Sequence, residues 1–171
     1  MKITDKYIFF YGGIYSQWYR CKISIGGIEY CTNEQYMMAK KAELFHDHLA
    51  YDAIMISQDP ASQKSWGKRV KNFDKDEWEA VARDIVYDAN YAKFTQHEDF
   101  RKQLIDSGDK IIVEGSPTDC IWGIGMSCDD PGILDPKNWR GTNWLGEAIM
   151  KVREQLMIDA KAQEYLTTQG D

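Results

Sequence analysis

Two side chains of opposite charge lie seven residues apart in the segment NEQYMMAKKAELFHD. If this segment forms a helix, Glu34 and Lys41 project from one face about 10.5 Å apart along the axis, because seven residues make two turns. Apolar side chains share their stripe, namely Met37, Met38 and Phe45. Such a pair either lines a cavity, or sits at the edge of the domain with both charges in water. The first alternative makes Glu34 and Lys41 candidates for proton transfer or nucleophilic attack.

A second group of candidates lies in the segment VEGSPTDCIWGIG. Glu114 ends an apolar run that predicts a buried strand, and Asp119 follows after a turn through Ser116 and Pro117. Carboxylates at such strand ends often face a crevice, although a surface ion pair for Glu114 and a turn cap for Asp119 also explain them. Trp122, which precedes a glycine, is placed to stack on a base or a sugar, unless it packs in the core.

A third candidate is the start of the last predicted helix, at Gly141, Thr142 and Asn143. Free backbone N–H groups at a helix start, together with the helix dipole, can hold a phosphate. Ordinary capping by Thr142 or Asn143 accounts for the same residues. Taken together, the three segments favour a polar pocket with carboxylate and amine groups.

Helices and strands must position these residues. Their predicted pattern indicates an α+β fold, a predominantly helical single domain packed on a small β-sheet. Strands are predicted within residues 7–13, 110–116 and 119–125, with a hairpin that turns at Gly26 and Gly27. Helices are predicted after the N-caps Thr32, Asp59 and Asp74, and over residues 48–57, 97–108 and 143–157. Residues 129–142 are expected to form a loop. The domain is expected to span residues 1–158, with a C-terminal tail at 159–171.

Composition narrows the class of protein. The 171 residues are 43% hydrophobic and 28% charged, which is typical of a globular domain, and the net charge of −6 argues against broad binding to nucleic acid or to an anionic membrane. The four cysteines form no CxxC pair, and no signal peptide or membrane-spanning run is present, so we expect a cytoplasmic protein without a metal site.

In sequence order, these motifs resemble the NADAR family of YbiA-like N-glycosidases. The matching segments are NEQYMMAKKAELFHD, WGKRV, the tryptophan-led helix ending in AKF, VEGSPTDCIWGIG and GTNWLGEAIMKVR. The resemblance covers nearly the whole chain, from about Tyr7 to Met157. It implies a YbiA-like fold and cleavage of an N-glycosidic bond between ribose and nitrogen. It implies as substrate either a phosphoribosylamino-pyrimidine of riboflavin synthesis or ADP-ribose on a guanine base, the latter also within a nucleic acid.

Carried over by position, the resemblance implies Glu34, Lys41 and Asp119 as catalytic residues. It also matches motif positions at Trp122, Gly123, Gly125, Asn143, Gly146 and Arg153. In this interpretation Trp122 stacks on the base or ribose, and Lys68, Arg69 and the helix start at Asn143 hold phosphate. Trp18 and Glu114 complete the expected substrate-binding set. No cofactor and no obligate protein partner is expected.

The chain departs from the family pattern at three places. Ser16-Gln17-Trp18 stands where the family usually has Ser-Asn before an aromatic residue, Gln35 stands where histidine is frequent, and Lys68 where arginine is usual. The expected catalytic residues are all present, so the departures concern the shape of the substrate pocket and its phosphate contacts.

Two routes fit the expected reaction. In direct hydrolysis, Asp119 or Glu34 stabilises an oxocarbenium-like state and activates water. In a covalent route, Lys41 attacks the anomeric carbon of an opened ribose and forms a Schiff base, which is the route we favour. A module that binds ADP-ribose or a nucleotide without cleaving it is the main alternative, and a structural adaptor is a third.

Overall fold

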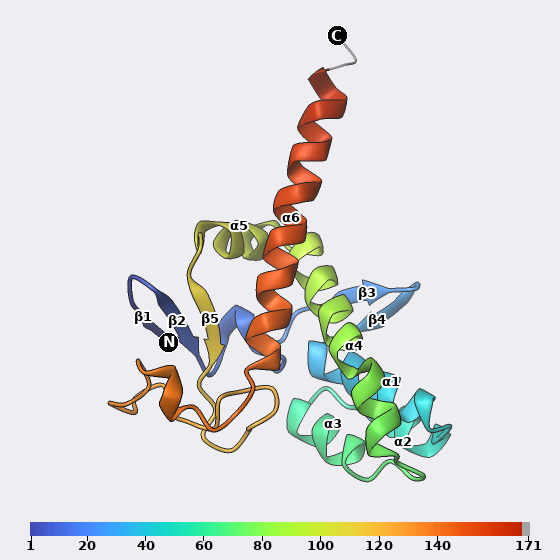
Figure 1. Ribbon diagram of the computed structural model, residues 1–171. Coiled ribbons are helices and arrows are strands. Elements are labelled where there is room, and N and C mark those ends of the chain that lie inside the picture. The colour runs from blue at the N-terminus through green and yellow to red at the C-terminus, as the bar shows by residue number, and fades with distance from the viewer. Residues whose placement is uncertain (169–171) are drawn as a thin grey trace. The chain divides into compact units, whose positions relative to one another are not determined.

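The computed structural model describes residues 1–168. Within it the chain divides into two compact units (Figure 1). Unit one contains Met1–Tyr11 and the chain from His97 on, and unit two contains Gly12–Gln96. The sequence predicts one domain and shows no linker between the units. Unit one is assembled from both ends of the chain, with unit two inserted between them in sequence, so the division leaves no mark in the composition.

Unit one is built around a three-stranded sheet with the order β1-β2-β5. Its elements are β1 (Lys2–Ile3), β2 (Tyr7–Phe10), α5 (Glu98–Asp106), β5 (Ile111–Glu114), a 3-10 turn η2 (Pro136–Asn138) and α6 (Trp144–Thr168). β2 is antiparallel to β1 and parallel to β5, where Phe9 pairs with Val113. Both residues are fully buried in a cluster with Ile124 and Ile133, so the loop after β5 covers one face of the sheet.

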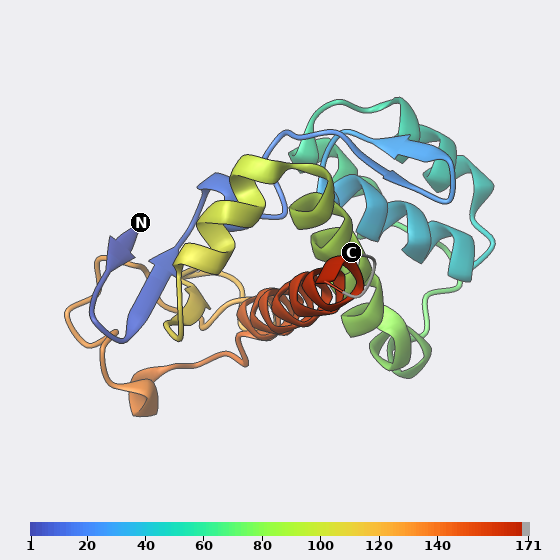
Figure 2. The same ribbon diagram turned by 90° about the horizontal axis from the view of Figure 1, so that it is seen from above.

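Unit two is a group of four helices with a hairpin. Its elements are a 3-10 turn η1 (Gly13–Tyr15), β3 (Ile23–Ile25), β4 (Ile28–Tyr30), α1 (Asn33–Leu44), α2 (His48–Ile56), α3 (Pro60–Gly67) and α4 (Lys75–Gln96). α1 packs against α2, α3 and α4, and Figure 2 shows α1, in blue, beside the green α4. The predicted caps are confirmed, because Thr32, Asp59 and Asp74 each accept a hydrogen bond from a backbone N–H three residues on.

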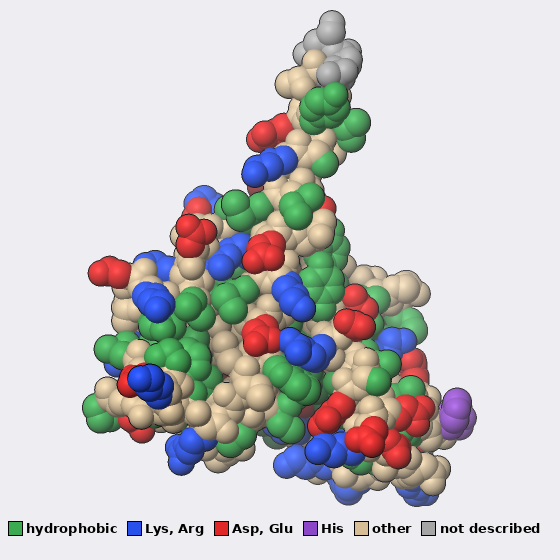
Figure 3. Space-filling model, viewed as in Figure 1, with side chains coloured by type: hydrophobic (Ala, Val, Ile, Leu, Met, Phe, Trp, Pro, Cys, Tyr) green, Lys and Arg blue, Asp and Glu red, His purple; other side chains and the backbone are tan. Residues whose placement is uncertain are grey.

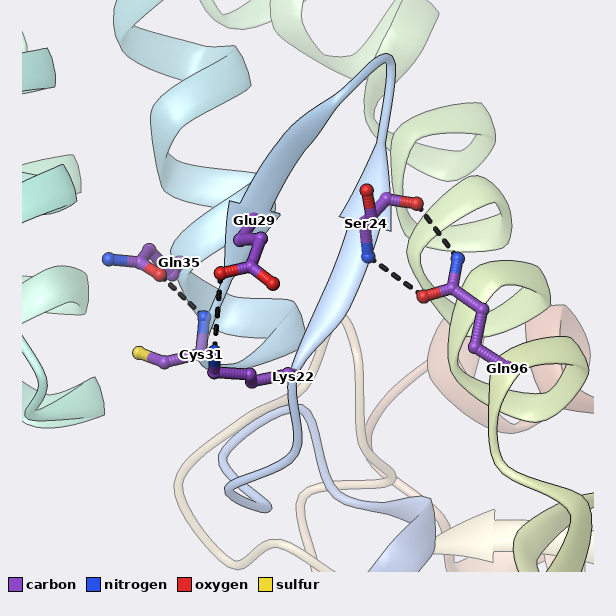
Figure 4. A network of polar contacts seen from close by, with 6 residues as sticks. All are labelled: Lys22, Ser24, Glu29, Cys31, Gln35 and Gln96. Atoms are coloured by element: carbon purple, nitrogen blue, oxygen red, sulfur yellow. Dashed lines mark hydrogen bonds and ion pairs between the residues drawn. The ribbon is translucent and has the colours of Figure 1, made fainter.

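The hairpin of β3 and β4 is fastened to the helices through glutamine side chains (Figure 4). The Gln96 carboxamide, at the end of α4, exchanges two hydrogen bonds of 2.8 Å with the backbone of Ser24. Gln35 of α1 accepts from the Cys31 N–H and donates to carbonyls at the end of α2. Gln35, which stands where the family often has histidine, therefore joins α1, α2 and the hairpin.

Two predictions about unit one need correction. Residues 119–125 form no strand. They form a series of bends, because carbonyl groups of residues 120–124 bond to residues 140–145 instead of to a neighbouring strand. α6 continues to Thr168, beyond Met157, where its regular part was expected to end. This last part of α6 extends past the other elements of unit one and exposes Ile158, Tyr165 and Leu166 together with charged side chains (Figures 1 and 3). No helix within residues 1–168 is long and apolar enough to cross a membrane.

Candidate functional site

Helix α1 presents Glu34 and Lys41 in a largely enclosed environment. Glu34 lies in the first turn and is only 5% exposed, while Lys41 lies in the last turn and is half-buried. Between them, Met38 packs on α3 at Gly67, where a Cβ atom would lie 1.9 Å from the Met38 sulfur. Glycine at this position therefore lets α3 approach the face of α1 that holds the pair.

The ammonium group of Lys41 lies over aromatic rings. Its Nζ is 4.0 Å from the centre of the Phe73 ring and 5.6 Å from that of Trp78, a geometry in which the ring faces attract the cation. Burial lowers the pKa of Lys41, and the negative charge of Glu34 partly opposes this shift. Lys41 is thus closer to a neutral amine than an exposed lysine, and it is electrostatically coupled to Glu34.

The loop before the hairpin contacts the start of α1. The Gln17 carbonyl accepts the Glu34 N–H at 3.0 Å, and the buried Gln17 carboxamide accepts hydrogen bonds from Asn33 and Asn90. Trp18, the next residue, is 43% exposed, and the Lys64 ammonium lies 5.8 Å from its ring centre. The loop therefore places an open aromatic ring directly after the residue that accepts the Glu34 N–H, and a cation of α3 lies over that ring.

The two expected phosphate-binding cations lie at the exposed end of α3. Lys68 caps the helix, and the guanidinium of Arg69 stacks at 4.2 Å on the Trp66 ring while it donates to Ser65. Both side chains are accessible to an anion. Their placement at a helix C-terminus means that the helix dipole also favours positive charge there.

In unit one, Asp119 has the contacts of a turn cap. Its carboxylate accepts hydrogen bonds from the N–H groups of Ile121 at 3.0 Å and Trp122 at 2.8 Å. The Trp122 ring is half-buried and meets Trp144 edge to face at 5.8 Å. The glycine after it is required by the protein itself, because a Cβ at Gly123 would lie 2.9 Å from the Glu114 carbonyl oxygen. Close approach of the chain to itself, rather than to a ligand, thus explains this glycine.

Three N–H groups at the start of α6 are already bonded within the protein, which limits the phosphate binding that the sequence suggested there. The N–H groups of Asn143, Trp144 and Leu145 donate to carbonyl oxygens of residues 121–123 at 3.1–3.2 Å. The Asn143 side chain bridges to β5: it accepts from the Glu114 N–H and donates to the Ile112 carbonyl. Asn143 therefore joins α6 to the sheet, and three of the N–H groups that were expected to hold phosphate already bond to carbonyl groups of the protein.

Arg153, a further family position, is buried and ties α6 to the segment after α5. Its guanidinium donates to the Ser107 hydroxyl at 2.7 Å and to the Lys110 carbonyl at 2.9 Å. The residue therefore has structural partners. Within residues 1–168, no three His, Cys, Asp or Glu side chains gather in a group that could hold a metal ion.

Sequence reasoning missed several residues around the pair on α1. The sequence gives no sign of Phe73, which precedes α4. It marks Trp78 only as the tryptophan that leads a matching helix, and Gln17 only as a departure from the family pattern. Asn90, in the middle of α4, is fully buried. A polar amide on an apolar helix face was the available signal for Asn90, whereas nothing local marks Phe73.

The chain is similar to known proteins over most of its length. The NADAR domain family model matches residues 9–157. N-glycosidase R617 of Acanthamoeba polyphaga mimivirus is 41% identical over 165 residues, which cover 89% of this chain and 97% of that protein. Riboflavin biosynthesis protein VVA0006 of Vibrio vulnificus is 25% identical over 92% of this chain, but the match covers 41% of that longer protein.

A solved structure is also similar. The NMR structure of the E. coli protein YbiA superposes with a TM-score of 0.76 at 29% identity, covering 93% of this chain and 89% of that one. The predicted α+β, YbiA-like fold is thereby confirmed.

Proposed function

The chain belongs to the NADAR domain family, and we propose from this membership that it hydrolyses the bond between a ribose carbon and a nitrogen of a base or amine. Its activity class is hydrolysis of N-glycosyl bonds, the class named for the mimiviral relative. The overall reaction adds water, so the ribose carbon receives a hydroxyl group and the leaving nitrogen receives a proton.

The observation that supports this proposal best is the environment of Lys41. The Lys41 amine is half-buried beside Phe73 and Trp78, and burial lowers its pKa, so at any given pH a larger fraction of it is neutral, and able to act as a nucleophile, than of an exposed lysine. The buried carboxylate of Glu34, electrostatically coupled to it, is suited to move protons.

These two residues suffice to write a balanced covalent route. The C1′–O4′ bond opens first, O4′ takes a proton through Glu34, and C1′ is left as an iminium with the leaving nitrogen. The Lys41 amine adds to C1′, Glu34 moves one proton from the lysine nitrogen to the leaving nitrogen, and the bond from C1′ to the leaving nitrogen breaks to give a protonated Schiff base on Lys41. Water then hydrolyses the C1′–lysine Schiff base and restores the amine. In the alternative route Glu34 activates water directly and Lys41 acts as a charge.

The remaining residues of the proposal bind substrate. Trp18 is open to stack on a flat ring, and Lys68 and Arg69 are open to bind phosphate. Asp119 and Trp122 stay in the proposal through their family positions, and Glu114 through its place at the end of β5. The contacts of Asp119 and Trp122 described above also give these two residues a structural role.

Two substrate classes are compatible with this site, a phosphoribosylamino-pyrimidine and an ADP-ribosylated guanine. Both combine a flat base, a ribose–nitrogen bond and phosphate. The Vibrio relative, named for riboflavin biosynthesis, supports the first class. The negative net charge of this chain favours a small substrate over a long nucleic acid.

The test is to incubate the protein with each substrate class and with NAD, and to identify released base and ribosyl product by mass spectrometry. Lys41→Met should abolish turnover, and Glu34→Gln should lower kcat by several orders of magnitude with near-normal binding. Lys40→Met is the matched control, because Lys40 is the neighbouring lysine and pairs with Glu43 on the exposed side. Borohydride added during turnover should trap a ribosyl adduct on Lys41.

Three outcomes separate the alternatives. A dead Lys41→Met without a trapped adduct would favour direct hydrolysis. Binding of all substrates without product would favour the non-catalytic ADP-ribose or nucleotide module. Full activity of Lys41→Met would refute the assignment of this site.

A further inference from the structure

Helix α4 contains a lysine that is completely buried. Lys93 has no exposed surface, and burial lowers the pKa of its ammonium group to about 8, partly opposed by the nearby thiol of Cys21. Burying an ammonium group costs stability, whereas methionine would fill much of the same volume without that cost. The role of Lys93 must therefore come from what its ammonium group binds.

The ammonium of Lys93 holds the loop that follows Gly13. It donates to the Ile14 carbonyl at 2.9 Å and to the Ser16 carbonyl at 2.8 Å. A neutral apolar side chain would leave both carbonyl groups without this donor, and the Ser16 carbonyl lies in a buried place where little water can replace it. The amine thus fixes two alternate peptide groups of one short loop.

The same loop is in direct contact with the proposed site. Gln17 directly follows Ser16 in the sequence, and its own carbonyl accepts the Glu34 N–H at the start of α1. The N–H of the following residue, Trp18, donates to the Ser16 hydroxyl at 3.1 Å. The loop therefore determines both where the first turn of α1 is held and where the open Trp18 ring lies.

Two neighbours of Lys93 on α4 support the same loop. Asn90, one turn earlier, donates to the Gln17 carboxamide at 3.1 Å, and the ring of Phe94 lies 6.2 Å from that of Tyr15. Asn90 and Phe94 are also fully buried. Consecutive turns of α4 thus contact the loop along its length, so the loop is held from the interior rather than by surface contacts.

We propose that Lys93 is a positioning residue, which through the carbonyl groups of Ile14 and Ser16 keeps the 14–18 loop in the place that the catalytic Glu34 and the substrate-stacking Trp18 require. The kinetic consequence of this inference rests on the proposed function. The tether, meaning the two hydrogen bonds from Lys93 to the carbonyl groups of Ile14 and Ser16, does not. Lys93 does not contact substrate in this account, because it has no exposed surface.

The tether is tested without substrate, by hydrogen exchange and mass spectrometry. Lys93→Met should raise the exchange of the amides of Ser16, Trp18, Tyr19 and Glu34 at least tenfold, relative to a reference segment in α2. Lys93→Arg, which keeps the charge and the donors, should exchange less than Lys93→Met. Lys75→Met is the matched control, since Lys75 lies on the same helix with an exposed side chain. Unchanged exchange in Lys93→Met would refute the tether.

Kinetics on the substrate turned over by the wild-type protein test the positioning role. Lys93→Met should lower kcat/KM at least tenfold in its folded fraction, with partial rescue in Lys93→Arg. Faster exchange with a normal kcat/KM would refute positioning and leave the N-glycosidase proposal intact. If the wild-type protein cleaves none of the substrates, the proposed function fails, and the exchange data still decide the tether. If Lys93→Met does not fold, Lys93→Gln is measured in the same way.

Discussion

Replacement of Asn143 should mainly destabilise the protein, although the sequence alone suggested a role in phosphate binding. Its side chain joins α6 to β5 through hydrogen bonds of 3.0 Å to the Glu114 N–H and 2.9 Å to the Ile112 carbonyl. The residue is 6% exposed, and its φ of 56° lies in the left-handed region. Alanine loses both bonds and also fits this backbone conformation poorly, while glycine loses the bonds but fits the backbone.

The magnitudes follow from these contacts. Each buried backbone group left without its partner costs about 1–3 kcal/mol, and a non-glycine residue without a local side-chain bond in the left-handed region costs about 1 kcal/mol or more. Asn143→Ala should therefore lower the free energy of unfolding by about 3–7 kcal/mol, against a total of about 5–15 kcal/mol for a typical domain. Asn143→Gly should be about 1 kcal/mol more stable than Asn143→Ala.

Urea denaturation of the wild-type protein and both variants measures these differences. Asn138→Ala is a suitable control, because the Asn138 side chain is exposed and donates to the Gly132 carbonyl, so its loss should cost less than about 1 kcal/mol. The reasoning is refuted if Asn143→Ala is as stable as the wild-type protein but binds substrate weakly. Glycine that is no better than alanine would refute the role given to the backbone conformation.

Three further results are expected. If the neutral Lys41 amine attacks the substrate, the rate should rise up to tenfold per pH unit below its lowered pKa, and a flat pH–rate profile would argue against the covalent route. Trp122→Ala should weaken substrate binding by about 5- to 150-fold if the ring stacks on a base, as titration calorimetry would measure, whereas unfolding with unchanged affinity would assign the ring to its contact with Trp144. Because the pKa of Lys93 is about 8 when folded and higher when unfolded, the unfolded chain binds more protons near pH 8–9, so stability should rise with pH. Between pH 7 and 9, the free energy of unfolding should rise by about 1 kcal/mol more with Lys93 than with Lys93→Met. Both proteins should carry Cys21→Ser, which removes the neighbouring thiol. Equal changes in the two proteins would mean that Lys93 titrates normally.

Helix starts and the hairpin turn were predictable from the sequence because they depend on neighbours within a few residues. Thr32 caps the N–H of Gln35, and Asp74 that of Glu77. The hairpin turns at Gly26 and Gly27, both of which have positive φ. The placement of Glu34 and Lys41 on one face of α1 was predictable for the same reason, since helical periodicity alone puts them on one stripe.

Everything that joins distant segments was decided by the tertiary structure. Residues 119–125 are predicted as a strand from the sequence, but their carbonyl groups bond to N–H groups some twenty residues later, so they form no strand and they occupy three N–H groups at the start of α6. Phe73 and Trp78, which surround Lys41, lie beyond two intervening helices in the sequence. Lys93 reaches Ile14 across 79 residues. A sequence pattern records which side chains can bond, but the partner of a long-range bond is selected only when packing brings the two groups together and excludes water from them.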